Sequence, residues 1–248
     1  MLSLRFRITI ASLVCVVIVS IGLQISSSLI SDAWLERFES KVFKSNDVLW
    51  NKIIASQQDA MEAGLPAITR DRKIRKLIKA GDITALEEEA SPAFRRLSAS
   101  NIITKQQITG LTGTVLLSLP KAFSGQSDKA LIKHAINEGK SFRGIEKDGN
   151  ELVIELAFPI LQRGKIVGAG IFMRSLQSAL DDFKTNNSSD ISIIYSDGTI
   201  DATTNPDLLQ SLDIAFPKLG EKSYQEVNIP GNKTLDRSNS YFFPLIET

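Results

Sequence analysis

One glutamate lies in the middle of an otherwise apolar stretch and is the first candidate for a binding role. Glu155 alternates with Val153 and Ala157, so these three side chains are expected on one face of a β-strand. A carboxylate on a covered face needs a cationic partner, and Arg143 on the preceding predicted strand is the candidate. Walled by Phe142, Val153 and Ala157, this pair could hold an amine or a carboxylate ligand. A cross-strand surface ion pair of little energetic value is the alternative interpretation.

The residue types that most often carry out catalysis are scarce in this chain. It has a single histidine, His134, and a single cysteine, Cys15, which excludes the usual His–Cys pairs and multi-His metal sites. It also has no phosphate-binding loop of the GxxxxGK or GxGxxG type. His134 is expected as an exposed helix residue, with a pH-sensing role as the alternative. We therefore predict no catalytic residue, no metal site, no cofactor and no enzymatic activity.

The charge balance argues against a nucleic-acid partner. The chain of 248 residues has 29 Lys and Arg against 28 Asp and Glu, a formal net charge of +1. Nucleic-acid surfaces need a clustered basic excess, and the basic run over residues 70–79 is better explained as the solvated face of a helix. A small molecule, a membrane and a second copy of the chain are the expected partners.

One apolar segment is predicted to anchor the chain in a membrane. Residues 8–30 are apolar, small or uncharged, close to the roughly 20 residues that a helix needs to cross a bilayer. Arg5 and Arg7 precede them, so residues 1–7 are expected in the cytoplasm. A cleaved signal peptide is the alternative, although the apolar run is longer than a signal core. We predict an inner-membrane protein with a single visible span and a periplasmic, extracytoplasmic bulk.

Residues 31–100 are predicted to form a helical stalk and connecting helices. No proline or glycine interrupts their first half, where apolar residues recur with helical spacing, so one long helix is expected up to Gly64. Two copies of the chain would form a homodimer through this helix. Shorter helices are predicted over 66–79 and 83–90, and a new one is predicted to start at Pro92.

A β-rich module is predicted over residues 101–186. The stretch 151–173 has the pattern of a hairpin whose first strand ends at Pro159, because proline cannot donate to a ladder. In the second strand of the hairpin, Gly168 and Gly170 share one face and leave a hollow. Either the long helix, packed closely, or a ligand is expected to fill it.

Two pairs of residues recur at one spacing and indicate an internal repeat. Gly113 precedes Pro159 by 46 residues, and Gly198 precedes Pro244 by 46 residues. The predicted elements between them have the same order, so a second module is expected over 187–248. It ends before a counterpart of the last strand of the first module. We therefore expect a longer protein that supplies this strand and a second membrane helix.

The segment AFPILQRGKIVGAGIFMRSL (residues 157–176) and the turn Asp197-Gly198-Thr199 resemble the double Cache family. The resemblance implies an α+β fold with an N-terminal transmembrane helix, a long extracytoplasmic helix and two tandem PAS-like modules with antiparallel sheets, the second truncated. It also implies a sensory region of a bacterial receptor of the chemoreceptor, histidine kinase or cyclic-dinucleotide enzyme type. In such receptors a small molecule commonly binds the membrane-distal module, here 101–186, and a long helix transmits the signal.

The resemblance does not identify the ligand. The Tyr/Arg/Trp/Asp signature of amino-acid-binding members of the family is not recognisable here, so an amino acid, an amine and a carboxylate all stay open. A membrane-anchored structural or pilin-like module without a small-molecule ligand is the alternative function. Pilins usually carry a glutamate within their apolar helix, and residues 8–30 contain no acidic residue.

Overall fold

The computed structural model describes residues 16–21, 41–42, 44–194, 199–211, 224–227 and 238–241. Their contacts define two compact units, residues 1–48 and 49–248. Residues 16–21 are helical, whereas the rest of the predicted anchor 8–30 and the predicted cytoplasmic segment 1–7 lie outside the described residues. Within the described part of the chain, no helix has both the length and the apolar character needed to span a membrane.

The helices before the sheet include a break between α2 and α3 that was not predicted. Their bounds are 44–64, α2 (Pro66–Thr69), α3 (Arg72–Ala80) and α4 (Ile83–Ala99). The long helix ends at Gly64 as expected, but the prediction of one continuous helix over 66–79 is wrong. Asp71 is extended, and its carboxylate accepts hydrogen bonds from the N–H groups of Lys73 (2.7 Å) and Ile74 (3.1 Å). This cap starts α3 as a separate helix.

The prediction that a new helix starts at Pro92 is also wrong, because α4 runs through this residue. Proline removes one helical N–H, but packing outweighs this loss. The buried face of α4 consists of Leu86, Ala90, Phe94 and Leu97, on both sides of the proline.

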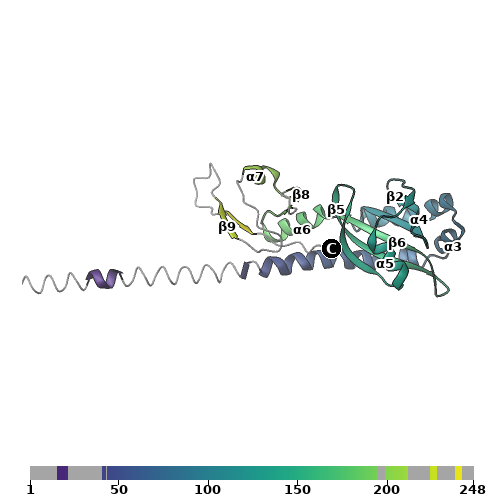
Figure 1. The fold of residues 1–248 in the computed structure, drawn as a ribbon, viewed down its shortest axis with the longest axis horizontal. Coiled ribbons are helices and arrows are strands. Elements are labelled where there is room, and N and C mark those ends of the chain that lie inside the picture. Colours follow the sequence, from purple (N-terminus) through teal and green to yellow (C-terminus); the bar gives the residue numbers. More distant parts are fainter. Residues whose placement is uncertain are drawn as a thin grey trace, which may run out of the picture. The chain divides into compact units, whose positions relative to one another are not determined.

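Six antiparallel strands form one sheet in the order β3-β2-β1-β6-β5-β4. Their bounds are β1 (Lys105–Gly110), β2 (Thr114–Leu119), β3 (Gly125–Gln126), β4 (Phe142–Asp148), β5 (Glu151–Gln162) and β6 (Lys165–Ser175). The hairpin of β5 and β6 is confirmed, and both turn residues, Arg163 and Gly164, have the positive φ that a type I′ turn requires. Figure 1 shows α3, α4 and α5 gathered around this sheet.

β5 does not end at Pro159, contrary to the prediction. The strand continues to Gln162, and Pro159 pairs in register with Ala169 of β6. On the other side, β4 pairs with β5 only as far as Ala157. Among the described residues, no strand pairs with this side of β5 beyond Ala157, so the missing N–H of Pro159 is tolerated.

The two faces of the sheet carry separate hydrophobic cores. The helix α5 (Ala130–Glu138) packs on β4, β5 and β6. The core beneath it consists of Ile132, Ala135, Val153, Ala157, Ala169, Ile171 and Met173. The opposite face is covered by the long helix, α2, α3, α4 and α6 (Gln177–Asn187), over a larger core that includes Ile154, Leu156, Phe158 and Phe172. The alternation along β5 thus places Glu155 under α5.

The predicted glycine hollow on β6 is filled by protein. A Cβ atom at Gly170 would overlap the ring of Phe158, and one at Gly168 would lie 3.1 Å from Ile78 Cγ2 of α3. Helix packing is therefore the correct alternative at Gly168, although the helix is α3 and not the long one. Neither position leaves room for a ligand.

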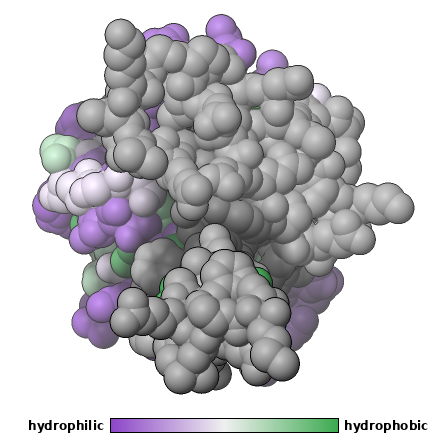
Figure 2. All heavy atoms as spheres, turned by 90° about the vertical axis from the view of Figure 1, so that its left-hand side faces the viewer, coloured by the Kyte–Doolittle hydropathy of each residue, from purple (hydrophilic) through white to green (hydrophobic). Residues whose placement is uncertain are grey.

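The described parts of residues 187–248 form two hairpins and a helix. The elements are β7 (Ser192–Ile194), β8 (Ile200–Thr203), α7 (Pro206–Ser211), β9 (Tyr224–Val227) and β10 (Ser238–Tyr241). β7 pairs with β8 and β9 with β10, both antiparallel. The extent of this second module and its truncation stay predictions, since Gly198 and Pro244 of the repeat lie outside the described residues. In Figure 2 the described residues on the visible surface are mostly hydrophilic.

Candidate functional site

A buried ion pair joins α5 to the middle of the sheet. Glu155 of β5 and Lys129, the residue immediately before α5, have side chains that are 0% and 1% exposed. Oε1 of Glu155 lies 2.7 Å from Nζ of Lys129. The same ammonium group lies 3.3 Å from Oδ1 of Asp148 and donates a hydrogen bond of 2.8 Å to the carbonyl oxygen of Lys147. Lys129 is therefore fully engaged by β4 and β5 beneath the start of α5.

The carboxylate of Glu155 is less well satisfied than the lysine. Oε1 of Glu155 is paired with Nζ of Lys129, but Oε2 has no hydrogen-bond partner among the described residues. Burial raises the pKa of Glu155 to about 7, and the attraction of Lys129 only partly opposes this effect. Glu146 and Asp148 raise the pKa further, since they add negative charge nearby. A buried acceptor without a donor is costly, which makes Glu155 the strongest candidate for contact with a ligand.

Asp148 also forms an ion pair with a second lysine, Lys105, which is more exposed than Lys129. Nζ of Lys105 lies 2.6 Å from Oδ2 of Asp148 and 2.5 Å from Oε1 of Glu151. Burial alone would raise the pKa of Asp148, but its contacts with Lys105 and Lys129 outweigh burial and lower the pKa. Burial alone would lower the pKa of Lys129, and the contacts with Glu155 and Asp148 reverse that effect and raise it. The cluster of two lysines and three carboxylates has an excess of negative charge.

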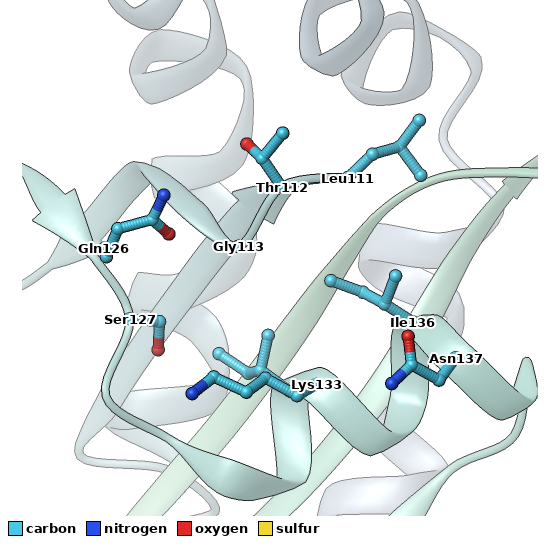
Figure 3. Close-up of a pocket in the computed structure, with 9 residues that line it drawn as sticks. Leu111, Thr112, Gly113, Gln126, Ser127, Lys133, Ile136 and Asn137 are labelled. Atoms are coloured by element: carbon cyan, nitrogen blue, oxygen red, sulfur yellow. The ribbon is translucent and has the colours of Figure 1, made fainter.

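A pocket of about 250 Å³ opens between the turn that joins β1 to β2 and the helix α5. Its lining consists of Leu111, Thr112, Gly113, Gln126, Ser127, Ile132, Lys133, Ile136 and Asn137. Figure 3 shows Gln126 and Ser127 on one side and Lys133, Ile136 and Asn137 of α5 on another. The pocket and the buried pair share the start of α5, since Ser127 Oγ accepts a hydrogen bond of 3.4 Å from the N–H of Lys129. A movement of this short segment would change both.

Three of the predicted site residues lie on the face of the sheet that carries Glu155. Val153 and Ala157 are fully buried in the core beneath α5, and Phe142 packs against that core. The ring of Phe142 also lies against His134, with centroids 5.6 Å apart. The alternation of side chains along β5 therefore predicted the correct neighbours of Glu155. Their roles in ligand binding stay predictions.

The predicted pairing of Glu155 with Arg143 is wrong. In the register of β4 and β5, Arg143 is opposite Leu156, whereas Gly144 is opposite Glu155, so Arg143 points to the other face. There its guanidinium group forms ion pairs with Asp59, at 2.7 Å, and with Glu62, both on the long helix. Arg143 thus links the sheet to the long helix instead of holding Glu155.

Sequence reasoning missed Lys129, the actual partner of Glu155. The signal that could have found it is local. Lys129 immediately precedes a helix that had to cover the apolar face around Glu155, so its side chain could reach under the helix start. Among the described residues, no cluster of histidine, cysteine and acidic side chains could hold a metal ion.

Replacement of Glu155 by glutamine is expected to flatten the pH dependence of stability. Because the pKa of Glu155 is raised to about 7 in the folded chain, its contribution favours folding at low pH and is lost as the pH rises through about 7. The melting temperature of Glu155→Gln relative to wild type should therefore increase from about pH 5.5 to about pH 8. Thermal unfolding of the whole chain at both values measures this change. The control is Glu88→Gln at an exposed position, whose melting temperature should differ from that of wild type by the same amount at both pH values. If the difference for Glu155→Gln were also the same at both pH values, the raised pKa of Glu155 would be contradicted.

The sequence of the chain matches the profile of a known protein family. The sequence profile of a double Cache family, described as the double sensory domain of two-component sensor kinases, matches residues 44–229, three quarters of the chain. The chain belongs to this double Cache family. The resemblance seen in the sequence is thus confirmed, and sensory function is favoured over the pilin-like alternative. Cache domains of this kind are extracytoplasmic sensor regions of membrane receptors.

Solved structures similar to this double Cache chain are sensor and ligand-binding domains. The sensor domain of the V. cholerae histidine kinase DctB is 16% identical, with 79% of this chain and 91% of that chain covered and a TM-score of 0.45. The ligand-binding domain of the Pseudomonas aeruginosa PAO1 amino acid chemoreceptor PctB, in complex with L-Arg, is 15% identical, with 75% and 82% covered and a TM-score of 0.40. No curated protein sequence gives a significant match.

Proposed function

We propose that this double Cache chain is the extracytoplasmic sensory domain of a membrane-bound receptor, of the chemoreceptor, histidine kinase or cyclic-dinucleotide enzyme type. It binds a small molecule under α5 and transmits the signal through the long helix. The observation that supports a binding site here is Glu155, a fully buried carboxylate whose Oε2 has no hydrogen-bond partner among the described residues. A residue of this kind is costly to keep in a core, and a ligand that donates to it removes the cost.

The charges of the site favour a ligand with an ammonium group. Such a group would donate to Glu155, while a carboxylate on the same ligand would accept from Lys129. An amino acid or another amine therefore fits the excess of negative charge, whereas a ligand with carboxylates alone fits less well. Because Lys129 covers Glu155, the start of α5 must move to admit the ligand.

The site can be tested by thermal-shift screening of the whole chain. The probes are the natural amino acids, linear polyamines and short dicarboxylates, each at a saturating concentration. A ligand of the folded state present at about 100 times its dissociation constant adds about 2.7 kcal/mol of stability. We expect shifts with compounds that carry an ammonium group, and we expect Glu155→Gln to lose them while Glu88→Gln keeps them. Shifts that survive Glu155→Gln would place the binding site elsewhere.

The remaining parts of the proposal concern the assembly. We infer that residues 8–30 anchor the chain in the inner membrane and that two copies associate through the long helix. We also infer that the chain has no enzymatic activity of its own, in keeping with the sensory description of its family. Robust hydrolysis by the purified chain in a turnover assay would contradict this last statement.

A further inference from the structure

Two adjacent residues of β4 contact elements on opposite faces of the sheet. Gly144 is opposite Glu155 in the register of β4 and β5, and it lies beneath α5. Arg143 precedes it and points to the other face, toward the long helix. Among the strands that the structure describes, β4 is at one end of the sheet and pairs only with β5. It therefore has more freedom to shift than the central strands.

The start of α5 rests directly on β4. A Cβ atom at Gly144 would lie 2.9 Å from Cδ1 of Leu131, so the leucine occupies the space that glycine leaves. The N–H of Leu131 also donates a hydrogen bond of 3.3 Å to Oε1 of Glu146. Since Leu131 is two residues from Lys129, a displacement at the buried pair reaches β4 without an intermediate element.

The same two residues hold the long helix on the opposite face. Arg143 bridges Asp59 and Glu62, which lie three residues apart on one side of that helix. In addition, Nε2 of Gln58 donates to the carbonyl oxygen of Gly144 at 3.4 Å. The stretch 58–62 is thus attached to β4 by side-chain contacts alone.

We propose that Arg143 and Gly144 form a relay that couples the buried Lys129–Glu155 site to the long helix, with Arg143 as the positioning residue. This proposal rests on the proposed function and deepens it by naming the point at which the site engages the helix. A change in the charge or the contacts of Glu155 displaces the start of α5, and this displacement shifts β4. Through the ion pairs of Arg143, the shift of β4 moves residues 58–62 of the long helix. A Cβ atom at Gly144 would require the end of the Leu131 side chain to shift.

The exposure of the ion pairs allows the relay to be tested without loss of the fold. The side chains of Arg143, Asp59 and Glu62 are 37%, 66% and 51% exposed. Ion pairs this exposed contribute little to stability, because water screens them and ordering of the side chains opposes them. Loss of Arg143 should therefore leave the fold nearly unchanged and uncouple the long helix from the site.

The test uses a tryptophan on the long helix and the charge of Glu155 as the trigger. Trp50 packs edge-to-face against Phe183 of α6, with ring centroids 6.3 Å apart, so its fluorescence reports the position of the helix. Trp34→Phe makes Trp50 the sole tryptophan, and His134→Gln removes the sole histidine. The charged groups near Glu155 are Lys129 before α5 and Glu146 and Asp148 on β4.

In this reference protein, Trp50 fluorescence should titrate between about pH 5.5 and about pH 8, and Glu155→Gln should abolish the change. Arg143→Met, and separately Asp59→Asn with Glu62→Gln, should reduce the amplitude at least twofold, while the pH dependence of the melting temperature stays. The exposed Arg163→Met is the control and should keep the full amplitude. A full amplitude in Arg143→Met, or no titration of Trp50 in the reference protein, would overturn the relay. Ligand shifts in the screen are independent of either result, so the sensory function can stand if the relay fails.

Discussion

Replacement of Lys129 by methionine is expected to lower the free energy of unfolding by about 3–5 kcal/mol at about pH 8. The substitution leaves Glu155 buried without its only nearby cation, at 0% exposure. Asp148 keeps a cationic partner, because Nζ of Lys105 lies 2.6 Å from its carboxylate. The pKa of Glu155 is already raised to about 7 by burial, and loss of Lys129 must raise it further. At about pH 5.5 the carboxyl group is then protonated, so the destabilisation should be much smaller there.

Denaturant unfolding of the whole chain at the two pH values measures this effect. Lys133→Met, an exposed lysine on α5, is the matched control and should change the free energy of unfolding by less than about 0.5 kcal/mol. The double variant with Glu155→Gln should recover much of the stability lost at the higher pH, since no charge is then left unpaired. An equal loss at both pH values would mean that Lys129 acts through packing alone.

Replacement of Gly168 by alanine is the second large effect, with an expected loss of about 3 kcal/mol in the free energy of unfolding. The added Cβ atom would overlap the backbone carbonyl oxygen of Thr109 and come within 3.1 Å of Ile78 Cγ2. The first of these atoms belongs to β1, the strand that pairs with β6 at the centre of the sheet. Only a shift of backbone can relieve the overlap, so the cost cannot be avoided by a change of rotamer.

Gly110→Ala is the matched control for this substitution. Gly110 pairs with Gly168 in the register of β1 and β6, yet the nearest atom to its added Cβ would be Cδ1 of Leu116, at 3.9 Å. The control should therefore keep its free energy of unfolding within about 0.5 kcal/mol of wild type. Similar losses for the two variants, measured by denaturant unfolding, would show that strand glycines here matter for propensity and not for close packing.

Local sequence patterns were sufficient to place Glu155 on the face of β5 that carries Val153 and Ala157. The alternation of β5 and the turn at Arg163 and Gly164 each follow from neighbouring residues, and both are confirmed. Family membership could also be predicted, because the segment 157–176 and the order of the elements around it resemble those of the family. These features depend on contacts close in sequence, which a single sequence displays.

The errors concern contacts that depend on register or on packing across the sheet. Arg143 and Glu155 are both on adjacent strands, but a register that differs by one residue puts them on opposite faces. Lys129 reaches Glu155 from the start of a helix 26 positions earlier, and no periodicity relates the two. Pro159 and Pro92 interrupt neither β5 nor α4, because a strand edge without a partner among the described residues and a buried helix face compensate for the lost N–H.

The position of a bound ligand tests the central claim most directly. The measurement is a crystal structure of the chain with the compound that gives the largest shift in the thermal screen. The proposal predicts that the ammonium nitrogen of this compound lies within hydrogen-bond distance of Oε2 of Glu155, with the start of α5 displaced from β4. A compound bound away from α5, with Glu155 still covered by Lys129, would contradict it.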